Sequence, residues 1–442
     1  MNIVIIGGDA AGMSAAMEIV RSPYEANITV LEKGGIYSYG QCGLPYVIDG
    51  SIAHTDELIA RSVEAFREQG IDARTYHEVT AVDVQQQIVT GIHTTTNEPF
   101  TIHYDKLLIA SGASPTMPNW ENRSLQGIHT VKTIPQMHAL LEDVVEAKHA
   151  TVIGAGYIAL EVAETLKKRG LAVRLIQRGK QLMSTVDEQL AVHILEEAER
   201  QGIDVRLNTN TLGFIGDSRV EAVCTTAGEL ATDVVIVATG VRPNTQFLEG
   251  TGIHLFDNGA VIVNGQMETN IANVYAAGDC ATHHLRNANR HTYIPLGTTA
   301  NKQGRIAGRV MSGQQAVFKG IVGTSVLKFF DLTIGQTGAN HAAITELGTP
   351  VHVLRTTANN HAGYYPHVEQ LHMCMWVHEK THELLGLQIV GGEGVDKRID
   401  VFATALVANM HIEDLLDLDL SYAPPYNGVW DPLQQMARKY VK

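Results

Sequence analysis

Two glycine-rich turns, each set between a strand and a helix, constrain this chain more than any other feature. The first turn, Gly7-Gly8-Asp9-Ala10-Ala11-Gly12, follows a β-branched run and precedes a helical stretch and a second strand that ends at Glu32. Glycines permit a tight turn and the close approach of a pyrophosphate to the helix N-terminus, and the later acid can bind ribose hydroxyls. The pattern predicts a Rossmann-type dinucleotide site at Gly7, Gly12 and Glu32. Asp9 departs from it, because a carboxylate is unfavourable there unless it points away.

A second copy of the pattern begins with Gly154-Ala155-Gly156-Tyr157-Ile158 and continues into a helix and a strand at residues 171–176. The recurrence predicts a second dinucleotide site that includes Gly154, Gly156, Tyr157 and Ile158. After the last strand, Gln177 and Arg178 stand where NAD sites carry an acid, and an arginine can pair with the 2′-phosphate of NADP. The turn favours NADPH, while NADH and a merely solvated basic turn remain open.

Further short motifs belong with the two turns. Residues 104–112 form a strand that ends in small residues at Ser111 and Gly112, and residues 233–240 form a similar unit that ends at Gly240. Such turns let a chain pass between domains beside a cofactor. Residues 274–277 form a strand that leads to Asp279, whose carboxylate can bind the ribityl hydroxyls of FAD. The order of these motifs predicts FAD at the first turn and NAD(P)H at the second.

Composition narrows the class of protein. The chain has 442 residues, of which 45% are hydrophobic and 18% charged, as in globular multidomain proteins. A net charge of -14 argues against nucleic acid as a partner, and no apolar run approaches the ~18 residues of a membrane span. The four cysteines have no metal-binding or CxxC spacing, which indicates free thiols in a reducing cytoplasm and no metal site. The N-terminus lacks the pattern of a signal peptide, so we expect no cleavage.

Three segments carry a resemblance to a known family: residues 38–46 (SYGQCGLPY), 295–305 (PLGTTANKQGR) and 394–400 (GVDKRID). With the two turns, they make the chain similar to the pyridine nucleotide-disulfide oxidoreductases over nearly its whole length. Within that family it resembles the single-cysteine branch of coenzyme A-disulfide reductases, NADH oxidases and NADH peroxidases. The resemblance adds Thr298 to the FAD site.

The same resemblance implies a fold class and a division into domains. The expected fold is α/β, with two Rossmann-like nucleotide-binding domains and a C-terminal α+β dimerisation domain that forms a homodimer. The FAD-binding domain is expected at residues 1–112 and 241–318, the NAD(P)H-binding domain at residues 113–240, and the C-terminal domain at residues 319–442.

The resemblance places Cys42 beside the flavin. Two-cysteine disulfide reductases carry their redox pair close together in sequence, whereas the nearest other cysteine here is Cys224. No internal disulfide can therefore form locally, and Cys42 must work as a sulfenic acid or as a mixed disulfide with a substrate thiol. The alternative is that Cys42 is a small buried hydrophobic residue.

Other residues bear on the choice of substrate. Ala10 stands where peroxidase-type relatives have a histidine, which counts against a peroxidase. Tyr364 and Tyr422 lie in motifs similar to those of coenzyme A-disulfide reductases, in which paired tyrosines of the neighbouring subunit approach the cysteine and can protonate a leaving thiolate. Tyrosines that only pack at an interface are the alternative. The remaining candidates for binding the substrate and its phosphates are Ser38, Arg21, Arg61 and Arg67, although exposed arginines are often only solvated.

The resemblance thus implies a flavoenzyme that passes hydride from NAD(P)H through FAD to Cys42. Cys42 then reduces coenzyme A disulfide, or a related small disulfide, through a Cys42–S–S–CoA mixed disulfide. Two alternatives stay open. One is an NADH oxidase or a sulfur or persulfide reductase that uses the same Cys42. The other is an electron-transfer flavoprotein in which Cys42 is incidental.

Overall fold

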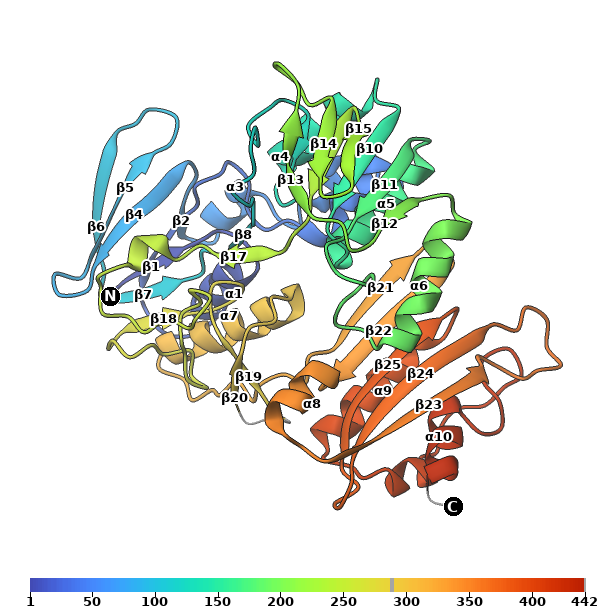
Figure 1. Ribbon diagram of the computed structural model, residues 1–442. Helices are drawn as coiled ribbons and strands as arrows, with labels where there is room; N and C mark the ends of the chain where they lie inside the picture. The colour runs from blue at the N-terminus through green and yellow to red at the C-terminus, as the bar shows by residue number, and fades with distance from the viewer. Residues whose placement is uncertain (287–289, 441–442) are drawn as a thin grey trace. The chain divides into compact units, whose positions relative to one another are not determined.

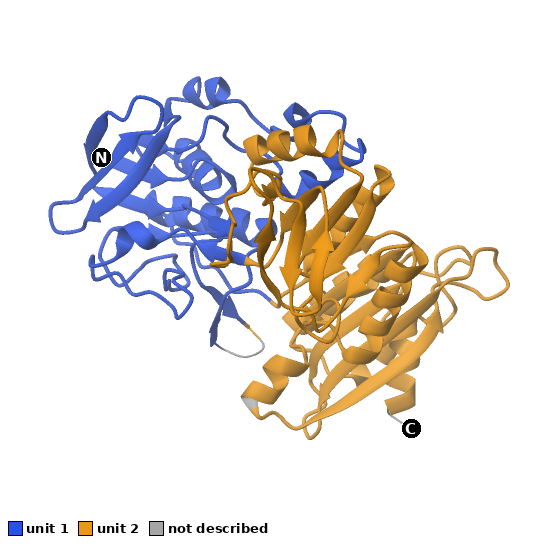
Figure 2. Ribbon diagram, turned by 45° about the horizontal axis from the view of Figure 1, so that its top comes forward, with its two compact units in different colours: residues 1–116, 241–285, 289–321 blue, residues 117–240, 286–288, 322–442 orange. Residues whose placement is uncertain are grey.

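The computed structural model describes residues 1–286 and 290–440, which form two compact units (Figures 1 and 2). Unit 1 contains residues 1–116, residues 241–285 and the described residues up to 321. Unit 2 contains residues 117–240, Arg286 and residues 322–440. The assignment of each part to a cofactor or to dimerisation stays a prediction.

Unit 1 is built on a five-stranded parallel sheet in the order β18-β7-β1-β2-β3. Its strands are short and mostly buried, as expected when both faces of a parallel sheet are covered. They are β1 (Asn2–Ile6), β2 (Asn27–Leu31), β3 (Ile71–Arg74), β7 (Lys106–Ile109) and β18 (Val274–Ala276). The chain moves from β1 outward to β2 and β3, and later to β7 on the other side of β1. The carboxyl ends of β1 and β7 therefore form the topological switch point at which α/β sheets bind ligands.

Helices α1 (Ala10–Val20) and α7 (Gly297–Met311) pack side by side in unit 1 (Figure 1). Glycines on α7 make this packing close. A Cβ atom on Gly304 would lie 2.1 Å from the carbonyl oxygen of Ala11, and one on Gly308 would lie 2.4 Å from that of Ala15. The two helices therefore approach each other at the level of their backbones.

Smaller elements complete unit 1. They include an antiparallel sheet of β4 (His77–Asp83), β5 (Ile88–His93) and β6 (Pro99–His103), and the pairs β8 (Ala113–Pro115) with β17 (Val241–Pro243) and β19 (His283–Leu285) with β20 (Arg290–Thr292). Short helices lie between β2 and β3, namely η1 (Gln41–Gly43), α2 (Pro45–Ile48), η2 (Thr55–Leu58) and α3 (Val63–Arg67), and η3 (Gln246–Leu248) follows β17.

Unit 2 begins with a second five-stranded parallel sheet, in the order β12-β11-β10-β16-β9. Its strands are β9 (Ile128–His129), β10 (His149–Ile153), β11 (Ala172–Ile176), β12 (Asp204–Arg206) and β16 (Val234–Val237). Helices α4 (Ile134–Val144), α5 (Tyr157–Lys168) and α6 (Glu188–Arg200) connect or flank them, and β13 (Thr211–Ile215), β14 (Ala222–Thr225) and β15 (Gly228–Ala231) form an antiparallel sheet. The strand, turn and helix of the first unit thus recur.

The C-terminal part of unit 2 is an antiparallel sheet in the order β21-β22-β25-β24-β23. It comprises β21 (Ser325–Phe329), β22 (Leu332–Gly338), β23 (Val351–Asn359), β24 (Gln370–His378) and β25 (Leu384–Gly391). Helices α9 (Val395–Val407) and α10 (Pro432–Tyr440) share its hydrophobic core, and α8 (His341–Leu347) and η4 (Glu413–Asp417) are shorter. With the two parallel sheets, this confirms the predicted α/β class with a C-terminal α+β part.

Residues 324–338 (TSVLKFFDLTIGQTG) predict a single strand at the start of the C-terminal region, but they fold as the hairpin β21–β22. Phe330 at the turn has a φ of 51°, in the left-handed region that bulky residues rarely adopt. Asp331 is the one turn-favouring residue between the two strands, and no glycine, proline or asparagine accompanies it, so the local sequence signal for this turn is weak.

Polar contacts bind the two parts of unit 2 to each other. The buried carboxylate of Glu164 on α5 accepts hydrogen bonds from the Lys328 Nζ (2.6 Å) and from the Phe330 N–H (2.8 Å). Arg355 on β23 pairs with Asp187, the N-cap of α6, at 2.7 Å. These contacts explain why the two parts form one compact unit.

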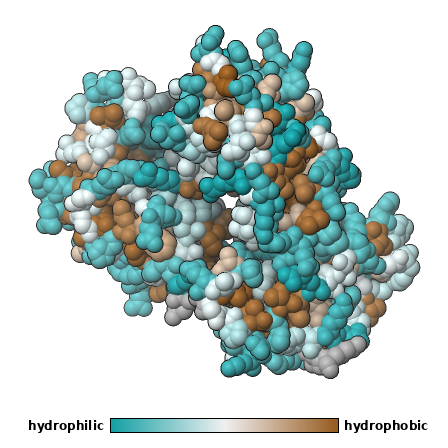
Figure 3. All heavy atoms as spheres, in the orientation of Figure 1, coloured by the Kyte–Doolittle hydropathy of each residue, from teal (hydrophilic) through white to brown (hydrophobic). Residues whose placement is uncertain are grey.

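On the face drawn in Figure 3, hydrophilic residues predominate and hydrophobic ones form small separate groups. In the part of the chain that the structure describes, no helix is long and apolar enough to cross a membrane.

We expect Gly304→Ala to destabilise the protein by about 1–3 kcal/mol, because the added methyl group would overlap the Ala11 carbonyl and force α1 and α7 apart. The control is Gly297→Ala in the same helix, where a Cβ meets no atom within 4 Å. Thermal and chemical unfolding of the two variants measures the difference. Equal stability of both variants would show that the close packing of the helices is unimportant.

Candidate functional site

The first glycine turn lies at the switch point of unit 1. Gly7 has a φ of +111°, and a Cβ on it would lie 2.1 Å from the carbonyl oxygen of Ala110, directly after β7. A Cβ on Gly12 would lie 2.0 Å from the Gly7 carbonyl oxygen. A side chain on Gly7 would clash with the backbone after β7, and one on Gly12 would push α1 away from the turn. The predicted residues Gly7, Gly12, Ser111 and Gly112 are thus drawn from two strand ends that lie next to each other.

Glu32 stands at the end of β2 and faces the same turn. One carboxylate oxygen accepts a hydrogen bond from the Gly8 N–H at 2.9 Å, and the other accepts one from the Gly34 N–H at 2.8 Å. A carboxylate has about four lone-pair sites, so these two bonds fix its orientation and leave capacity for ribose hydroxyls.

Asp9, the departure from the glycine pattern, is directed toward the segment that carries Cys42. Its carboxylate accepts a hydrogen bond from the Gln41 Nε2 at 2.6 Å and makes no capping bond to α1. The Ser38 N–H donates to the Gly8 carbonyl at 3.0 Å. Two hydrogen bonds therefore attach the Cys42 segment to the first turn. Sequence reasoning required only that Asp9 point away, and it missed Gln41 as the partner.

Cys42 lies in the short helix η1 and is exposed, and none of the four cysteines, all within the described residues, forms a disulfide. The other three are less accessible. Cys280 is buried, its thiol donates to the Ile109 carbonyl at 3.3 Å, and burial raises its pKa. Burial also raises the pKa of Cys374, on β24, to about 12, and Cys224 is half-buried in β14. Cys42 is thus the accessible thiol of the chain.

The remaining predicted FAD ligands also belong to unit 1. Ser111 is tied to Asn244 by two hydrogen bonds, in which its hydroxyl donates to the Asn244 carbonyl (2.6 Å) and its own carbonyl accepts from the Asn244 Nδ2 (2.9 Å). Asp279 follows β18 and is half-buried, and its backbone carbonyl accepts a hydrogen bond from the Tyr293 hydroxyl at 2.8 Å. Thr298 is exposed in the first turn of α7, whose N-terminus carries no side-chain cap and no acidic residue. This helix end can receive a negatively polarised group.

His283 is a residue that the sequence analysis did not single out. It is buried, and burial lowers its pKa to about 4, which keeps the imidazole neutral. Its Nδ1 accepts the Ile294 N–H at 3.2 Å, so the proton lies on Nε2, which has no hydrogen-bond partner among the described residues. Asp279 is the charged group that acts on this imidazole. A buried unpaired N–H in this unit is consistent with a polar ligand there.

The second glycine turn repeats the geometry of the first. Gly154 has a φ of +121°, and its Cβ would lie 2.2 Å from the carbonyl oxygen of Ala238, after β16. A Cβ on Gly156 would meet no atom within 4 Å, so the space beside the N-terminus of α5 is open. Ile158 is exposed there, and Gly240, with a φ of +111°, is exposed after the neighbouring strand. The open turn fits the pyrophosphate of a dinucleotide.

Three further predicted residues differ in how they are used. The Tyr157 hydroxyl lies 2.6 Å from the Ser325 Oγ and accepts from the Gln336 Nε2 at 2.7 Å, so it is committed to the C-terminal sheet. The Gln177 side chain donates to the Gln181 carbonyl at 3.3 Å. Arg178 is exposed, and no hydrogen bond or ion pair is found for it within the described part of the chain. Arg178 is thus the cation of this turn that remains available to a ligand.

Tyr364 and Tyr422 form a pair in the C-terminal part of unit 2. Their hydroxyl oxygens are 3.0 Å apart, and the side chains come from two segments that are distant in sequence. Tyr364 is 76% exposed and Tyr422 is 47% exposed. The hydrogen bond to Tyr422 raises the pKa of Tyr364. The sequence predicted a pair of tyrosines, and the structure brings the two phenols together.

The predicted substrate arginines differ in availability. Arg67 donates from Nε and Nη2 to the Ala73 carbonyl, at 3.1 and 2.9 Å, so two of its guanidinium nitrogens are already bonded within the protein. Arg61 is exposed and stacks on Phe66. Arg21 is exposed beside Glu18, 3.8 Å away. Ser38 has a φ of 45°, and its carbonyl accepts the Ala60 N–H. Arg21 and Arg61 are the better candidates for phosphate contacts.

Comparisons with known proteins agree with this arrangement. A family model for pyridine nucleotide-disulphide oxidoreductases matches residues 1–304, and the model for their dimerisation domain matches residues 324–432. The chain is 38% identical over 440 residues to the NAD(P)H sulfur oxidoreductase (CoA-dependent) of Pyrococcus furiosus, covering 99% of this chain and 98% of that protein. It is 32% identical over 441 residues to the coenzyme A disulfide reductase of Staphylococcus haemolyticus, covering 99% and 98%.

A solved structure is similar over the same length. The reduced CoADR-RHD of Bacillus anthracis superposes with a TM-score of 0.96 at 33% identity, covering 100% of this chain and 80% of that one. NADH oxidases are also among the similar proteins. The chain therefore belongs to the pyridine nucleotide-disulphide oxidoreductases, a family of enzymes that depend on FAD and NAD(P)H.

Proposed function

We propose that this enzyme oxidises NAD(P)H and reduces coenzyme A disulfide to two coenzyme A thiols at Cys42. The observation that carries the proposal is the exposed Cys42, which forms no disulfide and lies in a segment that Gln41 and Asp9 attach to the first glycine turn. A lone accessible thiol can cleave a disulfide only by forming a mixed disulfide with the substrate.

In this proposal, unit 1 holds FAD with Gly7, Gly12, Glu32, Asp279 and the N-terminus of α7. FAD bound there would supply the two-electron chemistry that links NAD(P)H to the disulfide at Cys42. The chain's own residues do the rest. The turns at Gly7 and Gly154 let helix N-termini approach the pyrophosphates, and Gln41 holds the Cys42 segment against the first turn.

Cys42 carries the substrate chemistry. Two-electron reduction of Cys42–S–S–CoA gives the Cys42 thiolate and one coenzyme A thiol. The thiolate then attacks a sulfur of coenzyme A disulfide, which restores the mixed disulfide and releases the second coenzyme A as a thiolate. The net reaction consumes one NAD(P)H, one proton and one coenzyme A disulfide. Arg21 and Arg61 contact the phosphates of the substrate.

Tyr364 and Tyr422 supply the proton to the leaving thiolate. Two exposed phenols joined by a 3.0 Å hydrogen bond can donate one proton and share the resulting charge. A dimerisation domain forms the C-terminal region, and we propose a homodimer in which the pair of one subunit reaches Cys42 of the other. We further propose that the enzyme works in the cytoplasm, where reducing conditions keep Cys42 available.

The second candidate is reduction of a coenzyme A polysulfide or persulfide at the same cysteine. It is favoured because the sulfur and persulfide reductases of the Pyrococcus species are 36–38% identical to this chain. The chemistry at Cys42 is the same attack on a sulfur–sulfur bond, and only the group beyond the second sulfur differs.

We expect Cys42→Ser to abolish disulfide-dependent oxidation of NAD(P)H while ferricyanide reduction, which needs only the bound flavin, persists. The control is Cys224→Ser, which replaces a half-buried cysteine of β14 and should change neither rate. Steady-state rates with coenzyme A disulfide and with coenzyme A persulfide separate the two candidates. Full turnover of both substrates by Cys42→Ser would exclude the proposed role.

Intact mass of the freshly purified protein tests the same proposal directly. An adduct with the mass of coenzyme A, removed by dithiothreitol and absent from Cys42→Ser, is the expected result. An oxygen adduct, with rapid oxygen consumption and no response to coenzyme A disulfide, would indicate an oxidase instead.

We expect Tyr364→Phe combined with Tyr422→Phe to lower kcat for disulfide reduction by about 10-fold or more, because a positioned proton donor is lost. The raised pKa of Tyr364 keeps its phenol protonated to higher pH, so wild-type kcat should fall only as alkaline pH ionises the pair. That alkaline decline should be missing from the double variant. Tyr365→Phe, a neighbouring tyrosine that packs on His361, is the control. A wild-type pH profile in the double variant would contradict the assignment.

We expect Arg178→Gln to raise KM for NADPH roughly 10-fold or more and to leave KM for NADH nearly unchanged, because a charge-assisted bond to the 2′-phosphate is lost. Lys180→Gln on the same turn is the control, since Lys180 is already paired with Glu188. Equal effects on both coenzymes would show that Arg178 is merely a solvated cation.

A further inference from the structure

The tyrosine pair lies on two segments that have little regular structure of their own. Tyr364 follows the end of β23, and Tyr422 lies between η4 and α10. One backbone hydrogen bond joins the segments, from the Ala362 N–H to the Pro424 carbonyl at 3.3 Å. Exposed irregular segments are mobile unless other contacts hold them. The 3.0 Å contact between the phenols therefore requires buried residues that hold both segments in place.

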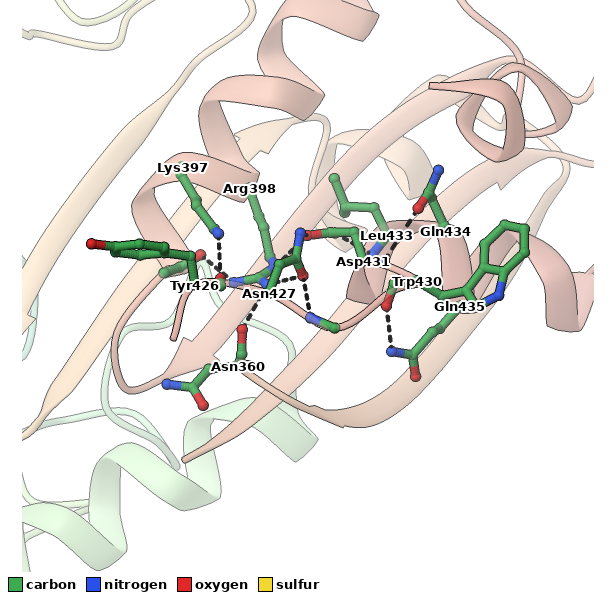
Figure 4. A network of polar contacts seen from close by, with 12 residues as sticks. Asn360, Lys397, Arg398, Tyr426, Asn427, Trp430, Asp431, Leu433, Gln434 and Gln435 are labelled. Atoms are coloured by element: carbon green, nitrogen blue, oxygen red, sulfur yellow. Dashed lines mark hydrogen bonds and ion pairs between the residues drawn. The ribbon is translucent and has the colours of Figure 1, made fainter. Parts of the chain in front are cut away.

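That support is a buried cluster around Arg398 on α9 (Figure 4). Arg398 is only 1% exposed, and its Nε pairs with the Asp431 carboxylate at 3.0 Å. Its Nη2 donates to the Asn360 carbonyl at 2.8 Å and to the Asn427 Oδ1 at 3.0 Å. One guanidinium therefore holds both segments, since Asn360 begins the segment of Tyr364 and Asn427 lies in that of Tyr422.

Asn427 extends the cluster to within one residue of Tyr422. Its Nδ2 donates to the Asp431 carboxylate at 2.8 Å and to the Ser421 carbonyl at 3.3 Å. The neighbouring Lys397 donates to the Tyr426 carbonyl at 2.6 Å. The segment of Tyr422 is thus held at Ser421, Tyr426 and Asn427. The contacts come from Arg398 and Lys397 on α9 and from Asn427 itself.

The sequence motif at residues 394–400 contains both Arg398 and the glycine that leaves room for its guanidinium. Arg398 turns back over the start of its own helix and donates from Nη1 to the Gly394 carbonyl at 2.8 Å. Gly394 has a φ of +86°, and a Cβ there would lie 2.6 Å from that Nη1. Burial lowers the pKa of Arg398, yet a guanidinium stays charged, and Asp431 supplies the balancing charge. A buried ion pair is weak evidence for net stability, and we infer that this one fixes the geometry of the segments it joins.

We propose that Arg398 is a positioning residue, which acts through Asn427 and Asp431 to hold Tyr364 and Tyr422 in the geometry for proton donation. This rests on the proposed function of the tyrosine pair. Arg398 touches neither phenol, so its effect on turnover passes through the pair.

The kinetic test uses the holoenzyme and the variant Asn427→Ala, which removes the link to Ser421 but leaves the Arg398–Asp431 ion pair. Disulfide turnover should fall about 10-fold in kcat with little change in KM for coenzyme A disulfide, and ferricyanide reduction should stay at the wild-type rate. Added to Tyr364→Phe/Tyr422→Phe, Asn427→Ala should have no further effect, because the groups it positions are absent. Additive losses would overturn the proposal.

Arg398→Lys provides a second variant that keeps the charge opposite Asp431 but cannot span the four acceptors of the guanidinium. Loss of the alkaline limb of the kcat profile is expected. The control is Arg355→Lys, which disturbs another arginine–carboxylate pair of unit 2, between Arg355 on β23 and Asp187 at the N-cap of α6. Wild-type kinetics in Arg398→Lys would mean that only charge balance matters, and an equal loss in Arg355→Lys would mean that the effect is general destabilisation; either result overturns the proposal.

A measurement that needs no turnover separates this inference from the proposed function. In protein labelled with 3-fluorotyrosine, the ¹⁹F resonances of Tyr364 and Tyr422 are assigned from the Tyr→Phe variants. Each should move when the other tyrosine is replaced, and this coupling should disappear in Asn427→Ala and in Arg398→Lys but persist in Arg355→Lys. Coupling that persists in all variants overturns the positioning role even if coenzyme A disulfide is the substrate. Coupling lost as expected supports it even if the substrate is a different one.

Discussion

Helix α1 begins directly over the end of strand β1 because no side chain stands between them. Gly12 sits against the Gly7 carbonyl, Gly7 sits against the backbone after β7, and Gly304 brings α7 against the same helix. This close backbone packing holds the first turn and helix α1 against the neighbouring backbone in unit 1. The candidate cofactor site depends on the missing side chains, since the glycine turn lets a pyrophosphate approach the N-terminus of α1.

The cysteine chemistry depends on the same turn. A carboxylate at the middle position of a glycine fingerprint is unfavourable beside a pyrophosphate, and here it is turned toward Gln41. The departure from the pattern therefore has a structural use, because it attaches the Cys42 segment to the turn. The three other cysteines are removed from solvent to different degrees, which leaves Cys42 as the most accessible thiol among the described residues.

In unit 2, polar groups rather than glycines set the geometry. The Glu164, Asp187 and Tyr157 side chains bind the nucleotide-binding part to the C-terminal sheet. Arg398 plays the corresponding part for the two tyrosine segments, where a fully buried charge with several acceptors permits few alternative arrangements. We infer that the exposed phenols of Tyr364 and Tyr422 stay at hydrogen-bonding distance because the Arg398 cluster that holds their segments is buried and shielded from solvent.

The sequence by itself determined the α/β class and the two glycine turns. It also determined that Glu32 and Arg178 follow the second strand of each unit, because these features obey local rules of strand, turn and helix. The pairing of Tyr364 with Tyr422 was expected only from family resemblance. The sequence could not reveal the Gln41–Asp9 bond, the unpaired His283 N–H, the turn at Phe330 or the Arg398 cluster. Each of these depends on residues far apart in the chain, or on a backbone conformation that no local residue specifies, so only tertiary packing decides it.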